Sequence, residues 1–196
     1  MEAYTHKVQY YETDQMGIVN HSNYIRWFEE ARTDFMEQLG MGYAEMEKEG
    51  IVSPVLGVDA TYLRMARFGD TVEIKTKIIS YNGIKLSMEY EIYNKETGLI
   101  DCKGTTHHCF LNRMGKPISL KRDLLNFHNM FLKGLEESQE EESSIADKDE
   151  ESKGQTPEED TVETQGENQE ENPNENVTDD CENYPEEGIE ERKDEE

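Results

Sequence analysis

The chain has 196 residues and a formal net charge of −25, and most of this charge lies at one end. Residues 136–196 hold 27 of the 45 acidic side chains and 4 of the 20 basic ones, so residues 1–135 are nearly neutral. So negative a chain is poorly suited to general nucleic-acid binding. We expect one folded domain over residues 1–135, a length that can bury its own core, followed by an acidic tail.

The tail, residues 136–196, consists mostly of Glu, Asn, Asp, Gln, Ser and Thr and has almost no aliphatic side chains. Such a segment cannot bury enough apolar surface to offset its ordering entropy, and its like charges repel. We predict that it is disordered. A solubilising role is favoured over a role as an electrostatic arm for a basic partner.

The remaining composition points to a cytoplasmic protein. The first residues lack the apolar core of a signal peptide, and no apolar run is long enough to cross a membrane. The three cysteines, Cys102, Cys109 and Cys181, form neither a disulfide framework nor a paired metal motif. A reducing compartment fits this pattern.

The domain begins with an alternating stretch and then changes period. Residues 4–11 alternate, which predicts a half-buried strand that brings Tyr10 to the inner face. From about Ser22 the apolar residues recur at helical spacing, which indicates a long, aromatic-rich amphipathic helix lying deep against a sheet. Asn20 or Ser22 can cap this helix, and Gly40 can end it.

A short helical turn at residues 43–49 is followed by four predicted strands, at residues 55–63, 71–80, 84–93 and 99–111. Asn82-Gly83 between two alternating runs is a strong hairpin signal. A last helix follows Pro117, with Ser119 as its cap and its apolar stripe formed by Leu120, Leu124, Phe127 and Phe131. This order predicts an α+β fold in which one antiparallel sheet packs on one helix.

The segment between the first strand and the long helix carries the most specific signal. It reads Tyr-x-x-x-Asp-x-x-Gly-[Ile/Val]-Val-x-His-x-x-Tyr, formed here by Tyr10, Asp14, Gly17, Ile18, Val19, His21 and Tyr24. With the later Arg-Met-Ala-Arg-Phe-Gly-Asp at residues 64–70, it resembles the 4-hydroxybenzoyl-CoA thioesterase-like family of acyl-CoA thioesterases. The resemblance covers residues 3–132. It implies the hot-dog fold: a five-stranded antiparallel sheet wrapped around one long helix, plus a C-terminal helix.

The resemblance implies that Asp14 is the catalytic carboxylate of a thioester hydrolase. It would attack the thioester carbonyl and form a mixed anhydride, or it would activate a water molecule. The sequence does not choose between these roles, and an ionised carboxylate serves both. A purely structural turn aspartate is the alternative interpretation, which the full motif disfavours.

His21 stands at or near the start of the long helix, where the first N–H groups have no internal partners and carry the positive end of the helix dipole. We expect the backbone N–H of His21, or of an immediate neighbour, to bind the developing oxyanion. Its imidazole could also orient Asp14 or water. A histidine that only forms local hydrogen bonds is the alternative.

The other motif residues have supporting roles under this interpretation. Tyr10 would position Asp14 or the attacking water, with core packing as an equally good alternative. Glycine is expected at position 17 either because the backbone there has a positive φ or because the substrate approaches the backbone closely. Ile18 and Val19 are expected as pocket walls or core.

Coenzyme A brings phosphates, which some relatives bind with a basic cluster at the hairpin before the third long strand. Here only Lys85 is basic in that hairpin, so both CoA and acyl-carrier-protein thioesters stay open as substrates. Arg64 and Arg67 could contribute, although solvated surface charges explain them as well. No cofactor is predicted. No metal site is predicted either, because the adjacent His107, His108 and Cys109 on one strand point to alternate faces.

The resemblance also implies a homo-oligomer, a dimer or tetramer, in which Asp14 faces strand residues of a second chain. Exposed strand edges are the supporting feature in the sequence. The fold also allows two alternatives to hydrolysis. A hot-dog hydratase lacks its usual motif here, and a non-catalytic acyl-CoA or acyl-carrier-protein binding module has no need for Asp14. The acyl group itself is left open, aliphatic or aromatic.

Overall fold

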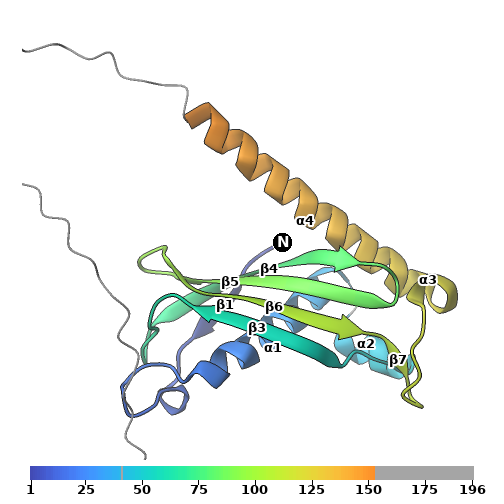
Figure 1. The fold of residues 1–196 in the computed structure, drawn as a ribbon, viewed down its shortest axis with the longest axis horizontal. Helices are drawn as coiled ribbons and strands as arrows, with labels where there is room; N and C mark the ends of the chain where they lie inside the picture. The colour runs from blue at the N-terminus through green and yellow to red at the C-terminus, as the bar shows by residue number, and fades with distance from the viewer. Residues whose placement is uncertain (41, 153–196) are drawn as a thin grey trace, which may run out of the picture. The chain divides into compact units, whose positions relative to one another are not determined.

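The computed structural model describes residues 1–40 and 42–152, and for residues 141–152 only the course of the helix. Five antiparallel strands form one sheet in the order β1-β4-β5-β6-β3 (Figure 1). The strands are β1 (Tyr4–Lys7), β2 (Ile51–Val52), β3 (Val55–Tyr62), β4 (Thr71–Tyr81), β5 (Lys85–Asn94), β6 (Ile100–Cys109) and β7 (Leu111–Asn112). The helices are η1 (Tyr10–Glu12), α1 (His21–Gln38), α2 (Tyr43–Lys48), α3 (Leu120–Asp123) and α4 (Leu125–Ser152).

The long helix α1 is the centre of the core. Its aromatic stripe packs on the sheet, with Trp27 fully buried and Phe28 stacked on Tyr90 of β5 at 4.6 Å between ring centroids. A Cβ on Gly104 of β6 would lie only 2.4 Å from the Phe28 ring, so the helix approaches the sheet backbone directly. The predicted arrangement, one antiparallel sheet around one long helix, is confirmed.

The first strand is shorter than predicted. β1 ends at Lys7, and the chain then turns into η1, where the Gln9 N–H donates to the Glu12 carboxylate at 2.6 Å. Tyr10 is 77% exposed and meets only the edge of Phe68, with ring centroids 5.6 Å apart. The prediction that a strand through residue 11 brings Tyr10 to the inner face is therefore wrong. The turn buries Glu12 in place of Tyr10.

The four later strands correspond to β3, β4, β5 and β6 within one or two residues at most ends. The run expected at residues 99–111 is divided, because β7 leaves the main sheet and pairs with β2 in a separate two-stranded sheet. Strands of two residues carry no periodic signal, so neither β2 nor β7 was predicted. In the main sheet, β1 and β3 are the two edge strands.

The C-terminal helix covers a strand edge that β1 leaves open. β1 pairs only with the first four residues of β4, and α4 packs along the remainder of that strand. The Ile78 N–H of β4 donates to Ser138 Oγ at 3.1 Å, and this hydroxyl donates to the Gly134 carbonyl at 2.7 Å. A Cβ on Gly134 would lie 2.9 Å from Leu39, so the helix sits close to α1 as well.

The single helix expected after Pro117 is two helices, α3 and α4, and α4 continues to Ser152. The domain boundary expected at residue 135 thus lies inside α4, because Ser138 is still packed on β4. The remainder of the acidic tail, residues 153–196, lies outside the described residues.

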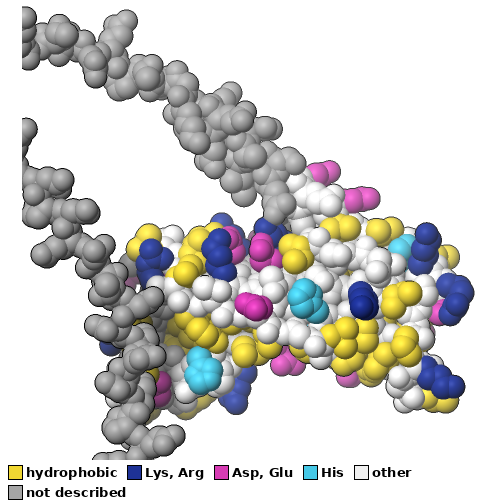
Figure 2. Space-filling view, in the orientation of Figure 1, with side chains coloured by type: hydrophobic (Ala, Val, Ile, Leu, Met, Phe, Trp, Pro, Cys, Tyr) yellow, Lys and Arg dark blue, Asp and Glu magenta, His cyan; other side chains and the backbone are white. Residues whose placement is uncertain are grey.

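The outer face of the sheet is polar. Figure 2 shows charged side chains of both signs over this face and hydrophobic side chains gathered toward the β3 border. Cross-strand ion pairs join β4 to β5 and β5 to β6, for example Lys77 to Glu89 and Lys103 to Glu91. Among the described residues, no helix combines the length and the hydrophobicity needed to cross a bilayer.

Candidate active site

The loop between η1 and α1 is a tight, internally bonded turn. The Asp14 N–H donates to the Ile18 carbonyl and the Gly17 N–H to the Asp14 carbonyl, both at 2.9 Å. Gly17 has a φ of +71°, a conformation that side chains with a Cβ rarely adopt. The Val19 N–H donates to the Ala66 carbonyl at 2.9 Å, which ties the loop to the segment after β3. The loop is therefore fixed at both ends.

This turn orients the half-buried Asp14 carboxylate. Asp14 Oδ1 accepts the Met16 N–H at 2.8 Å, an Asx-turn that fixes the carboxyl plane. Asp14 Oδ2 has no hydrogen-bond partner in the described part of the chain. One carboxylate oxygen is thus used for orientation, and the other is open to a water molecule or a substrate.

The N-terminus of α1 presents one unpaired amide. Of the two predicted caps, Asn20 and Ser22, Asn20 is the N-cap: its Oδ1 accepts the Ser22 N–H at 3.1 Å, and its carbonyl accepts the Asn23 N–H at 2.9 Å. The Asn20 N–H itself donates to the Glu12 carbonyl at 2.9 Å. Of the first four N–H groups, that of His21 is the one with no acceptor among the described residues. It lies at the positive end of the helix dipole.

A cavity of about 300 Å³ brings these groups together. Five of the predicted site residues line it: Asp14, Ile18, Val19, His21 and Arg64. The rest of its lining is mostly apolar or aromatic and comes from Met16, Tyr24, Tyr62, Leu63 and Met65. The cavity therefore combines a carboxylate and a helix N-terminus with walls suited to an acyl group.

Two tyrosines form the aromatic wall. The Tyr62 hydroxyl, at the end of β3, donates to the His21 carbonyl at 3.1 Å. The rings of Tyr62 and Tyr24 meet edge to face at 5.2 Å. Burial raises the pKa of Tyr24 to about 12, so its phenol stays protonated at neutral pH. Tyr62 thus links the edge of the sheet to the first residue of α1.

Four predicted site residues do not line this cavity. Gly17 acts through the turn conformation of the loop, and Tyr10 is exposed outside it. Arg67 is exposed in the turn after β3, and Lys85 is exposed at the start of β5. Even Arg64, which does line the cavity, donates through Nη1 to the Ile100 carbonyl. The described residues show no basic cluster at the cavity.

Sequence analysis missed Glu12, which is only 5% exposed. Its carboxylate accepts the Trp27 Nε1–H at 2.7 Å and the Gln9 N–H at 2.6 Å, and lies 3.0 Å from His6 Nε2. Burial alone would raise the pKa of Glu12, but these hydrogen bonds hold it below its usual value. The spacing Gln9-x-x-Glu12, that of a capping box, was the available signal.

The predicted divergence of the histidine pair is confirmed. His107 is exposed and its Nδ1 lies 2.9 Å from Ser87 Oγ, whereas His108 is buried with Nδ1 2.9 Å from Arg32 Nη1. Within the described ranges, no group of three His, Cys, Asp or Glu side chains could hold a metal ion.

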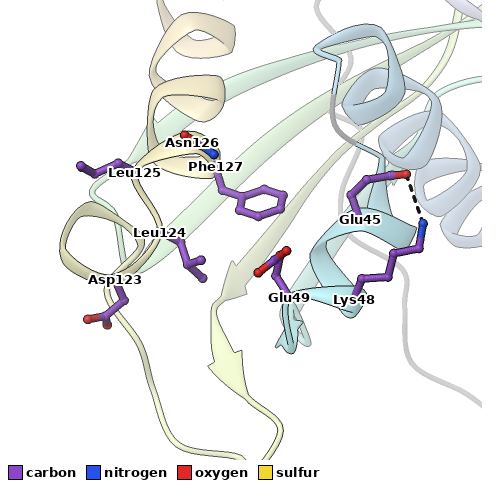
Figure 3. Close-up of a pocket in the computed structure, with 8 residues that line it drawn as sticks. All are labelled: Glu45, Lys48, Glu49, Asp123, Leu124, Leu125, Asn126 and Phe127. Carbon is purple, nitrogen blue, oxygen red and sulfur yellow. Dashed lines mark ion pairs between the residues drawn. The ribbon is translucent and has the colours of Figure 1, made fainter.

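A second cavity, of about 450 Å³, lies between α2 and the α3–α4 junction (Figure 3). Phe127 and Glu49 face it from opposite sides, and Glu45 forms an ion pair with Lys48 at 3.7 Å on its rim. It includes the first residues of α4 but contains none of the predicted site residues. We therefore place the candidate site at the Asp14 cavity.

Comparison with known proteins gives a consistent family. Residues 8–127 match the family described as the thioesterase-like superfamily. YneP of Bacillus subtilis (strain 168), provisionally named an acyl-CoA thioesterase, is 39% identical over 128 residues, which cover 65% of this chain and 92% of YneP. The acyl-CoA thioester hydrolase YbgC of Escherichia coli O6:H1 is 30% identical over 119 residues, covering 61% of this chain and 89% of YbgC.

Solved structures agree with these relatives. The crystal structure of DHNA-CoA thioesterase from Staphylococcus aureus matches with a TM-score of 0.65 and 35% sequence identity. The match covers 67% of this chain and 89% of that protein. The part of this chain that matches is the domain that carries the Asp14 cavity.

Proposed function

Because the chain belongs to the thioesterase-like superfamily, we propose that it is an acyl-CoA thioesterase that hydrolyses a small or medium acyl thioester to a free acid and CoA. The observation that carries this proposal is one shared cavity, lined by the Asp14 carboxylate and by His21 at the N-terminus of α1. The acyl-CoA thioester hydrolase YbgC and the Staphylococcus aureus DHNA-CoA thioesterase support the same reaction.

In this reaction Asp14 is the catalytic carboxylate. As a nucleophile, it attacks the thioester carbonyl, expels the CoA thiolate and leaves a mixed anhydride that water hydrolyses. As a general base, it takes a proton from the water that attacks. The free Asp14 Oδ2 suits both routes, because neither needs more than one carboxylate oxygen.

The His21 N–H is the proposed oxyanion donor. As the carbonyl becomes tetrahedral, its oxygen gains negative charge, which an unpaired amide at a helix N-terminus stabilises without reorganisation. The hydrogen bond from Tyr62 to the His21 carbonyl supports this role, since it helps to fix that peptide. The exposed His21 imidazole could orient the attacking water.

The acyl group would lie against Ile18, Val19 and the two tyrosines, which accept an aliphatic or an aromatic group. For the nucleotide, Arg64 at the cavity and the exposed Arg67 and Lys85 are the candidate phosphate contacts. Because Lys85 is the only basic residue of its hairpin and Arg64 already donates to the Ile100 carbonyl, we expect weak nucleotide binding, with most affinity from the acyl group. An acyl-carrier-protein thioester stays a possible substrate under this proposal.

We also propose a homo-oligomer formed through β3. This strand is an edge of the sheet, and it exposes apolar side chains: Val55, Leu56, Val58 and Tyr62 are between 42% and 56% exposed. An exposed apolar edge strand tends to pair with another strand. Because Tyr62 and Leu63 also line the Asp14 cavity, a second chain along β3 would add a wall to the site.

Thiol release from a panel of acyl-CoAs tests the proposal, with wild type and Asp14→Asn measured side by side. The substitution keeps the side-chain shape and removes its charge. We expect kcat/KM of the variant to fall by about a hundredfold or more. Asp34→Asn is the matched control: this half-buried aspartate of α1 lies outside the cavity, accepts the Gln38 amide at 2.7 Å, and should leave the rate unchanged when replaced.

The panel also separates the alternatives. The acyl-CoA that wild type hydrolyses with the highest kcat/KM identifies the preferred acyl group. If wild type and Asp14→Asn both bind the esters but neither releases thiol, the chain is a non-catalytic binding module. If Asp14→Asn retains full turnover, another group performs the chemistry.

A further inference from the structure

We propose that Glu12 is a positioning residue, which holds Asp14 and the N-terminus of α1 in the relative placement that hydrolysis requires. This inference rests on the proposed function. It adds a residue that lies outside the cavity and outside the motif that identified the site. Glu12 would act through its neighbours and not by touching the substrate.

The carboxylate of Glu12 joins three separate parts of the chain. It accepts hydrogen bonds from the Trp27 indole of α1 at 2.7 Å and from the Gln9 N–H of the preceding turn at 2.6 Å. It also lies 3.0 Å from His6 of β1, whose ring packs on Trp27 at 4.8 Å between centroids. A buried carboxylate with three donors is a rigid junction, because moving it would leave buried polar groups unpaired.

The backbone of Glu12 makes a second junction, with the start of α1. Its carbonyl accepts the N–H of the N-cap Asn20 at 2.9 Å and the buried Asn23 amide at 2.7 Å. One residue therefore anchors the helix turn that presents the His21 N–H. Glu12 makes these bonds only two positions before Asp14.

The residue that connects Glu12 to Asp14 is itself held by hydrogen bonds. Thr13, the residue between them, donates from its N–H and from its hydroxyl to the Tyr10 carbonyl, at 3.2 and 2.8 Å. A displacement of Glu12 is thus transmitted to Asp14 and to the helix N-terminus at once. Displacements of about 1 Å can lower the rate of an enzyme by about a hundredfold.

Glu12→Gln is the informative substitution, because it preserves volume and removes an acceptor. An amide offers one oxygen and adds an NH₂ group, so in either orientation that NH₂ faces the indole N–H or the Gln9 N–H. Glu29→Gln is the matched control, because Glu29 is an exposed residue of α1 whose side chain has no partner among the described residues. Trp27→Phe is a milder second variant that removes one donor and keeps a ring.

The experiment measures kcat and KM on the best acyl-CoA for these variants, each below its own melting temperature. We expect Glu12→Gln to lower kcat at least about tenfold with KM within about threefold, the signature of lost transition-state geometry. Trp27→Phe should lower kcat in the same way but less, and Glu29→Gln should not change it. In an Asp14→Asn background, Glu12→Gln should lower the residual rate by a smaller factor than in wild type, because the part of its effect that runs through Asp14 is then absent.

The outcomes separate this inference from the proposed function. If wild type hydrolyses the ester and Asp14→Asn does not, while a folded Glu12→Gln keeps the wild-type kcat, the positioning role is wrong and the function stands. If Glu12→Gln does not fold, an unchanged kcat in Trp27→Phe overturns the role equally. If wild type shows no hydrolysis, the proposed function has failed and the inference falls with it. Amide NMR shifts of Asp14 and His21 in Glu12→Gln, unchanged from wild type, would also overturn it.

Discussion

Gly17 turns the active-site loop with a φ of +71°, and a Cβ added there would meet no atom within 4 Å. The sequence left two reasons for this glycine, a positive φ or close approach of the substrate. The positive φ supports the first reason directly. The backbone conformation, more than any crowding, then explains why glycine precedes the Ile18-Val19 wall.

Substitution at Gly17 tests which reason holds. Gly17→Ala should destabilise the fold by about 1–2 kcal/mol, because an alanine is strained at positive φ. Gly17→Asn should recover much of that loss, since asparagine tolerates the left-handed region. Thermal melts and kcat/KM of both variants give the measurement. Equal losses of kcat/KM without a change in stability would indicate close approach of the substrate.

Among single residues, the sequence predicted those whose positions follow from the motif spacing. It missed those whose positions depend on contacts between distant parts of the chain. Asp14 and His21 come to one cavity because a short turn and a helix start follow each other directly. Glu12 is buried and Tyr10 is exposed, contrary to the prediction, because the Glu12 carboxylate accepts a hydrogen bond from the Trp27 indole, which lies 15 residues further on. The local capping-box spacing of Gln9 and Glu12 signals a turn there, but it does not indicate the contact with Trp27 that buries Glu12.

Among the elements, α4 acts as a substitute strand partner for β4. Beyond the four residues that pair with β1, the edge of β4 would be open, and Ser138 takes up one of its amides, that of Ile78. An unsatisfied buried N–H is unfavourable, so this contact should contribute to stability. It also blunts an edge that could pair with other chains.

Ser138→Ala should lower the free energy of unfolding by about 1–2 kcal/mol, because the buried Ile78 N–H loses its acceptor. Ser80→Ala, at an exposed position on the same strand, is the control and should change stability by less than about 0.5 kcal/mol. Urea denaturation followed by circular dichroism measures both. Equal stability of Ser138→Ala and wild type would mean that α4 does not protect this edge.

The long elements were predictable and the short ones were not. α1 and strands β4 and β5 carry ten or more residues of clear period, so the sequence predicts which of their side chains are buried. The elements η1, β2 and β7 span two or three residues and exist because of contacts elsewhere. The break between α3 and α4 at Leu124 likewise lies within one continuous apolar stripe, which predicted a single helix.

For the whole molecule, a buried polar chain joins the helix to the sheet. Arg32 of α1 lies 2.9 Å from His108 of β6, whose Nε2 lies 2.8 Å from Thr106, and Thr106 lies 2.9 Å from the Tyr90 hydroxyl of β5. Burial, with the nearby Arg32 charge, lowers the pKa of His108 to about 4. His108 is therefore neutral in the folded protein at pH values where an unfolded histidine is protonated.

This pKa predicts a loss of stability in mild acid. The contribution of His108 is fully present above pH 6.5 and is lost as the pH falls toward 4, because only the unfolded state binds the proton in that range. The free energy of unfolding should fall by about 3 kcal/mol between pH 7 and pH 4 from this group alone. Urea titrations of His108→Gln should show a flatter pH profile, and those of the exposed His107→Gln should match wild type. An unchanged slope in His108→Gln would contradict this assignment.

The oligomeric state of the molecule determines whether one chain or two chains form the walls of the Asp14 cavity. Val58 of β3 and Ile79 of β4 are equally exposed, at 42% and 43%, but β3 is an edge strand of the main sheet, whereas α4 packs along this part of β4. A charge at Val58 would be buried if two chains meet along β3, and a buried unpaired charge is strongly unfavourable.

Light scattering should therefore give a multimeric mass for wild type and for Ile79→Glu, and a monomeric mass for Val58→Glu. Because Tyr62 and Leu63 line the cavity next to this edge, Val58→Glu should also lower kcat/KM, by about tenfold or more, while its far-ultraviolet circular dichroism stays that of wild type. A monomeric wild type with full activity would mean that each chain builds a complete site. A multimeric Val58→Glu would move the interface to another surface and remove β3 from the substrate pocket.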